Sequence, residues 1–221
     1  MKIIAINGSP RRSGNTATLL HKALEGAAAA GAETECIDLY TLNYKGCISC
    51  FSCKRKDKKH GVCAVKDELA PVLEKVKQAD AVLFGSPIYF MNLTSGLQAF
   101  LERFFFSQTI YSREIPSVLG KKMPSAFVYT MNVTKEHAEK YHLKDSLMFY
   151  EMAALKILGT IPHRLFAYNT VQFNDYSKYE SSVFSEAEKK AYRQEHWEQD
   201  LQQAYGLGQQ LVKEAEQALP H

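Results

Sequence analysis

The first forty residues alternate between short apolar runs and a helical segment, and this order limits the fold more than any other feature. Residues 2–7 form a run with three isoleucines that stops at Gly8, which predicts a buried strand. Leucine and alanine then recur at helical spacing over 14–30, and 33–39 alternates as a second strand does. Two strands separated by one helix predict parallel pairing with a right-handed crossover.

The same alternation continues along the rest of the chain. Further strands are predicted at 80–85, 124–130 and 163–171. Further helices are predicted at 67–78, 93–106, 144–158 and about 185–218. Five strands alternating with helices predict a single α/β domain over 1–221, built as a doubly wound sheet with helices on both faces. A loop at about 40–66 interrupts the pattern.

Composition and charge exclude several classes of protein. Apolar residues make up 46% and charged residues 23% of the 221 positions, which is typical of a globular domain and not of a disordered or collagen-like chain. The chain has no run of about 18 apolar residues and no leader-like start, so we expect no membrane span and a cytoplasmic location. The net charge of +3 comes mainly from the basic run at 54–60, which favours a solvated loop over a nucleic-acid surface.

The segment after the first strand carries the chemistry of a phosphate site. Residues 8–16 read Gly-Ser-Pro-Arg-Arg-Ser-Gly-Asn-Thr, and ligands of open α/β sheets bind outside the carboxyl ends of the strands. Hydroxyl, amide and guanidinium groups at a helix N-terminus suit an anion. The candidates are Ser9, Arg11, Ser13, Asn15 and Thr16. The dinucleotide and P-loop patterns are absent, which favours a terminal phosphomonoester. The alternative is a capped turn, with Ser13 or Asn15 as the N-cap.

A second candidate loop follows the third strand. Its residues Pro87, Ile88, Tyr89 and Phe90 offer an apolar wall and backbone donors, which a flavin ring requires. The alternative is a hydrophobic loop that packs on the next helix. A third loop, which begins at Thr130, is expected at the same edge of the sheet, so Thr130 is a further candidate for binding the cofactor.

The two motifs together resemble a known family. Gly-Ser-Pro-Arg-x-x-Gly-Asn-Thr at 8–16 and Gly-Ser-Pro-Ile-Tyr-Phe at 85–90 are similar to the NAD(P)H-dependent FMN reductases, which are flavodoxin-like proteins related to iron–sulfur flavoproteins. The resemblance covers residues 1 to about 130. It implies a sheet of order 2-1-3-4-5 and FMN as cofactor. It places the FMN phosphate on Ser9, Arg11, Asn15 and Thr16, with Ser13 nearby, and the isoalloxazine on Pro87, Ile88, Tyr89 and Phe90.

The resemblance also implies an activity. Electrons would pass from NADH or NADPH through FMN to a small acceptor, such as a quinone, a flavin, or a nitro- or azo-aromatic compound. Because the flavin carries the chemistry, no catalytic protein residue is assigned. The family implies a homodimer or homotetramer, and it often has glycine where this chain has Met91. The alternative is an electron carrier like flavodoxin, although such carriers tend to be shorter and strongly acidic.

Four cysteines lie within seventeen positions of the 40–66 loop. Cys47, Cys50, Cys53 and Cys63 are spaced as in a metal or redox site in a reducing compartment, and four thiolates can hold a [4Fe-4S] cluster. Iron–sulfur flavoproteins have a compact motif of this kind, usually with a shorter final gap. The alternatives are free thiols in a surface loop and, less compatible with the spacing, a structural zinc.

Two further segments are open to a functional interpretation. The basic run at 54–59 is expected near the carboxyl edge of the sheet, where it would attract the phosphates of NADPH or remain a solvated loop. Five aromatic residues fall in a polar background at 168–184. This segment is either a flap near the flavin or a contact with a neighbouring subunit.

Overall fold

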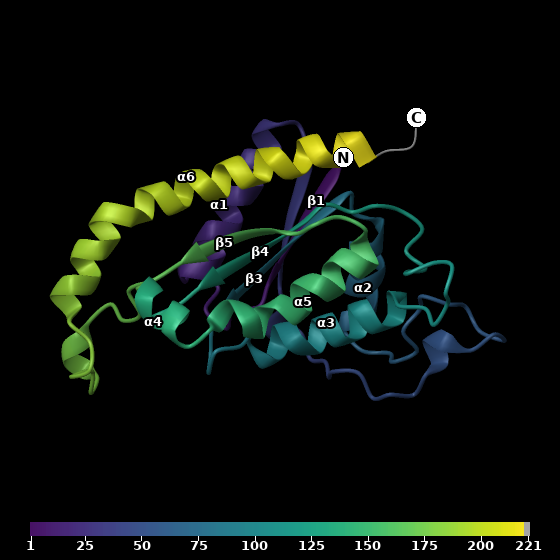
Figure 1. The fold of residues 1–221 in the computed structure, drawn as a ribbon, viewed down its shortest axis with the longest axis horizontal. Helices are drawn as coiled ribbons and strands as arrows, with labels where there is room; N and C mark the ends of the chain where they lie inside the picture. The colour runs from purple at the N-terminus through teal and green to yellow at the C-terminus, as the bar shows by residue number, and fades with distance from the viewer. Residues whose placement is uncertain (219–221) are drawn as a thin grey trace.

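A computed structural model describes residues 1–218 as a parallel sheet covered by helices on both faces (Figure 1). The strands are β1 (Lys2–Asn7), β2 (Glu33–Asp38), β3 (Ala81–Pro87), β4 (Ser125–Thr130) and β5 (His163–Ala167). They pair in the order β2-β1-β3-β4-β5, all parallel. The doubly wound α/β sheet and the 2-1-3-4-5 order are therefore confirmed. The last three residues of the expected 1–221 domain lie outside the described part.

Six helices connect and flank the strands in residues 1–218. They are α1 (Asn15–Ala29), α2 (Leu69–Gln78), α3 (Ser95–Gln108), α4 (Lys135–Lys140), α5 (Leu143–Leu158) and α6 (Glu186–Ala218). Among these described residues, no helix has both the length and the apolar character that a membrane crossing requires.

The alternation of side chains along β1 divides the interior into two cores. Ile4 and Ile6 point to one face of the sheet, where they pack with apolar residues of α2, α3 and α5. Ile3 and Ala5 point to the opposite face, which α1 and α6 cover. All four side chains are fully buried, as expected for a central strand of a doubly wound sheet. The apolar run at the start of the chain therefore forms β1 because both of its faces are covered.

Helix α6 crosses α1 at unusually close range. A Cβ on Gly208 of α6 would lie 1.8 Å from Ala23 O, and a Cβ on Gly26 of α1 would lie 1.9 Å from Tyr205 O. Neither position has room for a side chain, so the two glycines allow the backbones to touch. Figure 1 shows α6 running across the molecule, with its first turns on the side to which β4 and β5 point.

Two local expectations from the sequence differ from the structure. The last strand ends at Ala167 and not at residue 171. The strand stops because Asn169 adopts a left-handed conformation with φ of 46° and its N–H donates a hydrogen bond to Val133 O. Helix α4 was not expected, and it begins after Thr134, whose side chain accepts a hydrogen bond from His137 N. Both changes shape the loops that follow β4 and β5.

Candidate functional site

The carboxyl ends of β1, β3 and β4 meet at one edge of the sheet. Gly8 N donates a hydrogen bond of 2.8 Å to Gly85 O, and Ile88 N donates one of 2.9 Å to Thr130 O. A Cβ on Gly8 would lie 2.7 Å from the Cβ of Leu97, so glycine is required where the first loop passes α3. The three loops that the sequence placed at this edge are therefore neighbours in the fold.

Helix α1 begins at this edge without a cap. Gly14 is the N-cap residue, no side chain accepts a hydrogen bond from the first turn, and that turn holds no acidic residue. The alternative of a turn capped by Ser13 or Asn15 is wrong. By contrast, the side chain of Thr94 accepts a hydrogen bond from Leu97 N at the start of α3. The first N–H groups of α1 are thus free donors at the positive end of the helix dipole.

The turn before α1 is held by its own polar groups. Asn7 is fully buried, its Oδ1 accepts from Ser9 N at 3.0 Å, and its Nδ2 donates to Asp38 Oδ1 at 2.8 Å. The hydroxyl of Ser9 accepts from Arg11 N at 3.1 Å. Ser9 therefore shapes the loop in this state, with its hydroxyl engaged inside the turn.

The two arginines of the first loop have different partners. Arg12 pairs with Asp38 at 3.0 Å, which offsets its charge. Arg11 donates from Nη1 to the carbonyl oxygen of Gln172 at 2.5 Å and pairs with no carboxylate of residues 1–218. Arg11 thus keeps an uncompensated charge beside the uncapped end of α1.

Asn15, the first residue of α1, joins the loop to two distant segments. Its Nδ2 donates to Val171 O at 3.0 Å, and its Oδ1 accepts from Arg193 Nη1 at 3.1 Å. The side chain of Asn15 is therefore engaged on both sides. Arg193 was missed by sequence reasoning because it lies on α6, whose pattern of apolar residues indicates only a packed helix.

Thr16 and Thr130 face each other below the loops. Both are buried, and their hydroxyl oxygens lie 2.7 Å apart. The sequence proposed both as FMN ligands. In this structure the hydroxyl groups bond each other and so tie α1 to the end of β4.

The loop after β3 ends in a tight turn that exposes an aromatic ring. Tyr89 and Asn92 exchange two backbone hydrogen bonds of 2.9 and 3.0 Å. The two residues between them, Phe90 and Met91, adopt positive φ angles of 48° and 62°, which is strained for side chains of this size. Phe90 is fully exposed and Tyr89 is half exposed. The loop does not pack on the next helix as a whole, since its aromatic rings face solvent.

This loop has fewer free backbone N–H donors than the sequence indicated. The N–H of Ile88 is bonded to Thr130 O and that of Tyr89 to Asn92 O, and Pro87 has none. The N–H groups of Phe90 and Met91 remain for a ligand. The side chain of Ile88 packs against the core.

These features fit FMN, the cofactor that the resemblance of the two motifs implies. The uncapped α1 and Arg11 supply donors and positive charge for a phosphate, and the strained 89–92 turn supplies exposed aromatic surface for a ring. The two halves are neighbours at one edge of the sheet. A molecule with a phosphate at one end and a flat ring at the other matches this arrangement.

Comparison with known proteins decides the family. The family model described as NADPH-dependent FMN reductase matches residues 1–161, which is most of the chain. The chain belongs to this family. The resemblance to this family, which the motifs at 8–16 and 85–90 indicated, is thereby confirmed.

Relatives of this FMN reductase family member include iron–sulfur flavoproteins. One from Methanocaldococcus jannaschii is 40% identical over 103 residues, which cover 47% of this chain and 51% of the relative. One from Archaeoglobus fulgidus is 39% identical over 47% of this chain and 48% of the relative. The chain spans about half the length of the curated relatives it matches.

Solved structures of similar fold include reductases. An NAD(P)H:quinone oxidoreductase from Methanothermobacter marburgensis has a TM-score of 0.68 at 18% identity, over 96% of this chain and 98% of that one. An azoreductase from Bacillus anthracis has a TM-score of 0.63 at 15% identity, over 95% and 99% of the two chains. At this level of identity the likeness establishes the flavodoxin-like fold of the family member.

The four clustered cysteines of this family member line one pocket. Cys47 and Cys50 are exposed, Cys63 is partly exposed, and Cys53 is buried. Burial raises the pKa of the Cys53 thiol. Through residue 218, no three side chains of His, Cys, Asp or Glu are arranged closely enough to hold a metal ion. The four thiols therefore share one pocket, but they are not arranged to hold a single metal ion.

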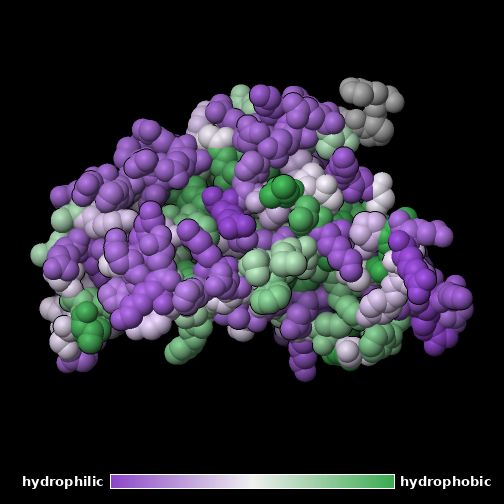
Figure 2. Space-filling model, viewed as in Figure 1, coloured by the Kyte–Doolittle hydropathy of each residue, from purple (hydrophilic) through white to green (hydrophobic). Residues whose placement is uncertain are grey.

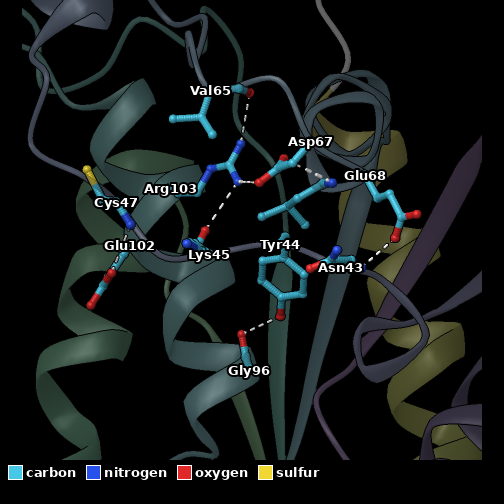
Figure 3. A network of polar contacts seen from close by, with 11 residues as sticks. Asn43, Tyr44, Lys45, Cys47, Val65, Asp67, Glu68, Gly96, Glu102 and Arg103 are labelled. Atoms are coloured by element: carbon cyan, nitrogen blue, oxygen red, sulfur yellow. Dashed lines mark hydrogen bonds and ion pairs between the residues drawn. The ribbon is translucent and has the colours of Figure 1, made fainter.

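Arg103 of α3 holds both ends of the cysteine segment (Figure 3). It is 1% exposed, and its guanidinium donates to Lys45 O and to Val65 O at 3.2 Å each. The same group pairs with Asp67 at 2.5 Å, while its Nε has no partner. Arg103 also lines the cysteine pocket. One buried cation thus closes the segment between residues 45 and 65 against α3.

The basic run lies far from the position expected for it. Lys54 donates to the carbonyl oxygens of Phe106 and Thr109 at the end of α3. Gly61 O accepts from Lys77 at the end of α2 and from Gln108. Since α2 leads directly into β3, these contacts place the run toward the amino edge of the sheet. The expectation that 54–59 attracts the NADPH phosphates at the carboxyl edge is therefore wrong.

Proposed function

We propose that this protein binds FMN at the carboxyl edge of its sheet and acts as an NAD(P)H-dependent oxidoreductase. The observation that carries the proposal is the uncapped start of α1 beside the exposed turn at 89–92. When bound, FMN supplies the hydride and electron transfer chemistry. The protein supplies binding and orientation.

Each half of the site has a defined task in this proposal. The N–H groups at the start of α1 and the guanidinium of Arg11 bind the phosphate, with the hydroxyl of Ser13 nearby. Tyr89 and Phe90 form a wall for the isoalloxazine, and Pro87 and Ile88 shape the strand end that supports them. The free N–H groups of Phe90 and Met91 face the polar edge of the ring.

The electron acceptor is proposed to be a small aromatic molecule. Phe90 is fully exposed, so the wall of the ring site is open to an incoming flat compound. Proteins of similar fold are named as quinone and azo reductases. We therefore propose a quinone, a flavin, or a nitro- or azo-aromatic compound as the acceptor.

A charge placed at the start of α1 tests the proposal directly. Gly14→Asp supplies both an N-cap and a negative charge, so it should stabilise α1 and prevent FMN binding. Gly14→Asn supplies the cap without the charge, and it should bind FMN more tightly than the aspartate variant. FMN binding is measured by quenching of flavin fluorescence, and NADPH and NADH are then added anaerobically to the complex. Unchanged FMN binding by Gly14→Asp would contradict a phosphate site at the start of α1. Bound FMN that neither NADPH nor NADH reduces would favour an electron carrier.

A second candidate function adds a [4Fe-4S] cluster. The observation that favours it is the single pocket shared by Cys47, Cys50, Cys53 and Cys63, together with the unpartnered Nε of Arg103 in its lining. A buried N–H donor and a positive charge suit a negatively charged thiolate-bound cluster. Iron and sulfide analysis of anaerobically prepared protein tests this, with Cys36→Ser as the control variant and Cys50→Ser as the disrupting one. Absence of iron from the native protein would exclude the cluster.

We also propose that the chain forms a homodimer or homotetramer. Helix α5 exposes a row of apolar side chains at helical spacing, namely Met148, Phe149, Met152 and Leu155. Figure 2 shows hydrophobic surface over the region of α5 on this face. Sedimentation equilibrium should give a multiple of 25.0 kDa, and Phe149→Glu should reduce it.

A further inference from the structure

Two cations of α6 lie at the same edge of the sheet as the proposed phosphate site. Lys189 and Arg193 are one helical turn apart on a segment outside the 1–161 range of the family match. The first turns of α6 extend past α4 on that side of the molecule (Figure 1). Any role of these two residues in binding would therefore come from a helix that the family match does not cover.

Arg193 is a half-buried cation that lacks an acidic partner. Its Nη1 donates to Asn15 Oδ1, and its guanidinium lies 4.2 Å from the centre of the Trp197 ring. No carboxylate of residues 1–218 pairs with it, and burial lowers its pKa. A desolvated guanidinium with one hydrogen bond keeps most of its donors free for an anion.

Lys189 fixes the loops beside Arg193. It is 2% exposed, and its Nζ donates to Asn132 O at 2.8 Å and to Asn169 Oδ1 at 2.7 Å. Burial lowers the pKa of Lys189 to about 8. It also forms no ion pair within the described chain. Lys189 therefore joins the loops after β4 and β5 and, after Arg11 and Arg193, adds a third uncompensated positive charge to this edge.

The segment after β5 is bound directly to the phosphate loop. Val171 O accepts from Asn15, and Gln172 O accepts from Arg11. With Arg193 on the other side of Asn15, three segments converge on the first residue of α1. The first part of the aromatic segment at 168–184 is thus a wall of the site, which agrees with its interpretation as a flap more than as a subunit contact.

We propose that Arg193 is a phosphate-binding residue of the flavin site, which makes the protein select FMN over riboflavin. This inference rests on the proposed FMN function. Asn15 positions the guanidinium beside the uncapped end of α1, and Lys189 holds the surrounding loops. A dianionic phosphate at that end would be the counter-charge that Arg11 and Arg193 lack, whereas riboflavin offers no such group.

The competing explanation is that Arg193 only stabilises the packing of α6. Its contacts with Trp197 and Asn15 would then support the site indirectly. A structural role would weaken FMN and riboflavin binding alike, whereas a phosphate contact would weaken only FMN binding. The comparison of the two flavins therefore separates the explanations.

The test uses the full chain freed of flavin and titrated with FMN and with riboflavin. Arg193→Met removes the charge and keeps an apolar stem, and Arg193→Lys keeps the charge without the planar fork. Lys190→Met is the matched control, because it removes one charge from the same helix at an exposed position that pairs with Glu186. Dissociation constants come from quenching of flavin fluorescence at two salt concentrations.

We expect Arg193→Met to weaken FMN binding by about 10- to 100-fold, to flatten its dependence on salt, and to leave riboflavin binding within about twofold. Arg193→Lys should fall between Arg193→Met and the native protein, and Lys190→Met should match the native protein. Equal loss for both flavins, or no loss for either, would overturn the role of Arg193 while the native protein still binds FMN. Failure of the native protein to bind FMN would overturn the proposed function itself.

Discussion

The hydroxyl oxygens of Thr16 and Thr130 lie 2.7 Å apart in the interior, and this bond joins the first turn of α1 to the last residue of β4. Replacing either threonine by valine leaves the other hydroxyl buried without a partner. We expect Thr16→Val and Thr130→Val each to lower the free energy of unfolding by about 1–3 kcal/mol. The double variant should lose less than the sum of the two. Strictly additive losses in denaturant unfolding would show that the bond contributes nothing.

The contact between α1 and α6 predicts opposite effects at two glycines of one helix. Gly208→Ala should destabilise the protein by about 1–3 kcal/mol or more, because its Cβ would meet Ala23 O. Gly206→Ala should stabilise it by about 0.5–1 kcal/mol, because no atom lies within 4 Å of the new Cβ and alanine favours helix. Thermal unfolding of both variants checks this, and equal shifts in Tm would contradict the close crossing.

The strained turn at 89–92 predicts that stability and binding change in opposite directions. Phe90 has a positive φ and buries none of its side chain, so Phe90→Gly should raise the stability of the flavin-free protein by about 0.5–1 kcal/mol. The same change removes part of the ring wall and should weaken FMN binding. Val183→Gly serves as a control, since Val183 is exposed to 83% without a positive φ and should gain no stability. A loss of stability in Phe90→Gly would argue against strain.

The carboxyl group of Asp200, which lies outside the proposed flavin site, predicts that folding stability depends on pH. Burial raises the pKa of this carboxyl to about 6, although His196 opposes the shift. Between pH 4 and 6 the unfolded chain releases the proton before the folded chain does, so folding stability falls as the pH rises. Asp200→Asn should therefore match the native protein near pH 4 and exceed it at pH 7. A difference between the two proteins that is constant over this range would rule out the shifted carboxyl.

The sheet and the loops at its edge could be predicted from local sequence signals. The isoleucine run of β1 and the glycine-bounded motifs at 8–16 and 85–90 each lie within one short stretch of chain. The two motifs are expected to lie close together, because the carboxyl ends of parallel strands share one edge of the sheet. For this reason the meeting of the loops agrees with the expectation from local sequence, whereas the 2-1-3-4-5 strand order was implied only by the resemblance to the family.

The remaining contacts of the site depend on segments far apart in sequence. Arg193 reaches Asn15 across 178 positions, and no local pattern marks it as different from the other charged residues of α6. The side-chain hydroxyls of Ser9 and Thr16 are occupied by partners that only the folded chain reveals. The basic run was misplaced because its position depends on where the long 40–66 loop folds back, and charge alone does not determine that path.

The place of α6 in the chain has a consequence for biosynthesis. The last strand is complete at Ala167, yet the helix that covers α1 begins only at Glu186. At about 5–20 residues per second, the ribosome leaves the apolar face formed by α1 and its neighbours bare for seconds after the sheet can form. During that interval the nascent chain presents an exposed apolar surface to which chaperones or a second chain can bind. The completed fold is therefore the product of a late docking event, and its yield in cells should depend on the speed of translation between these two points.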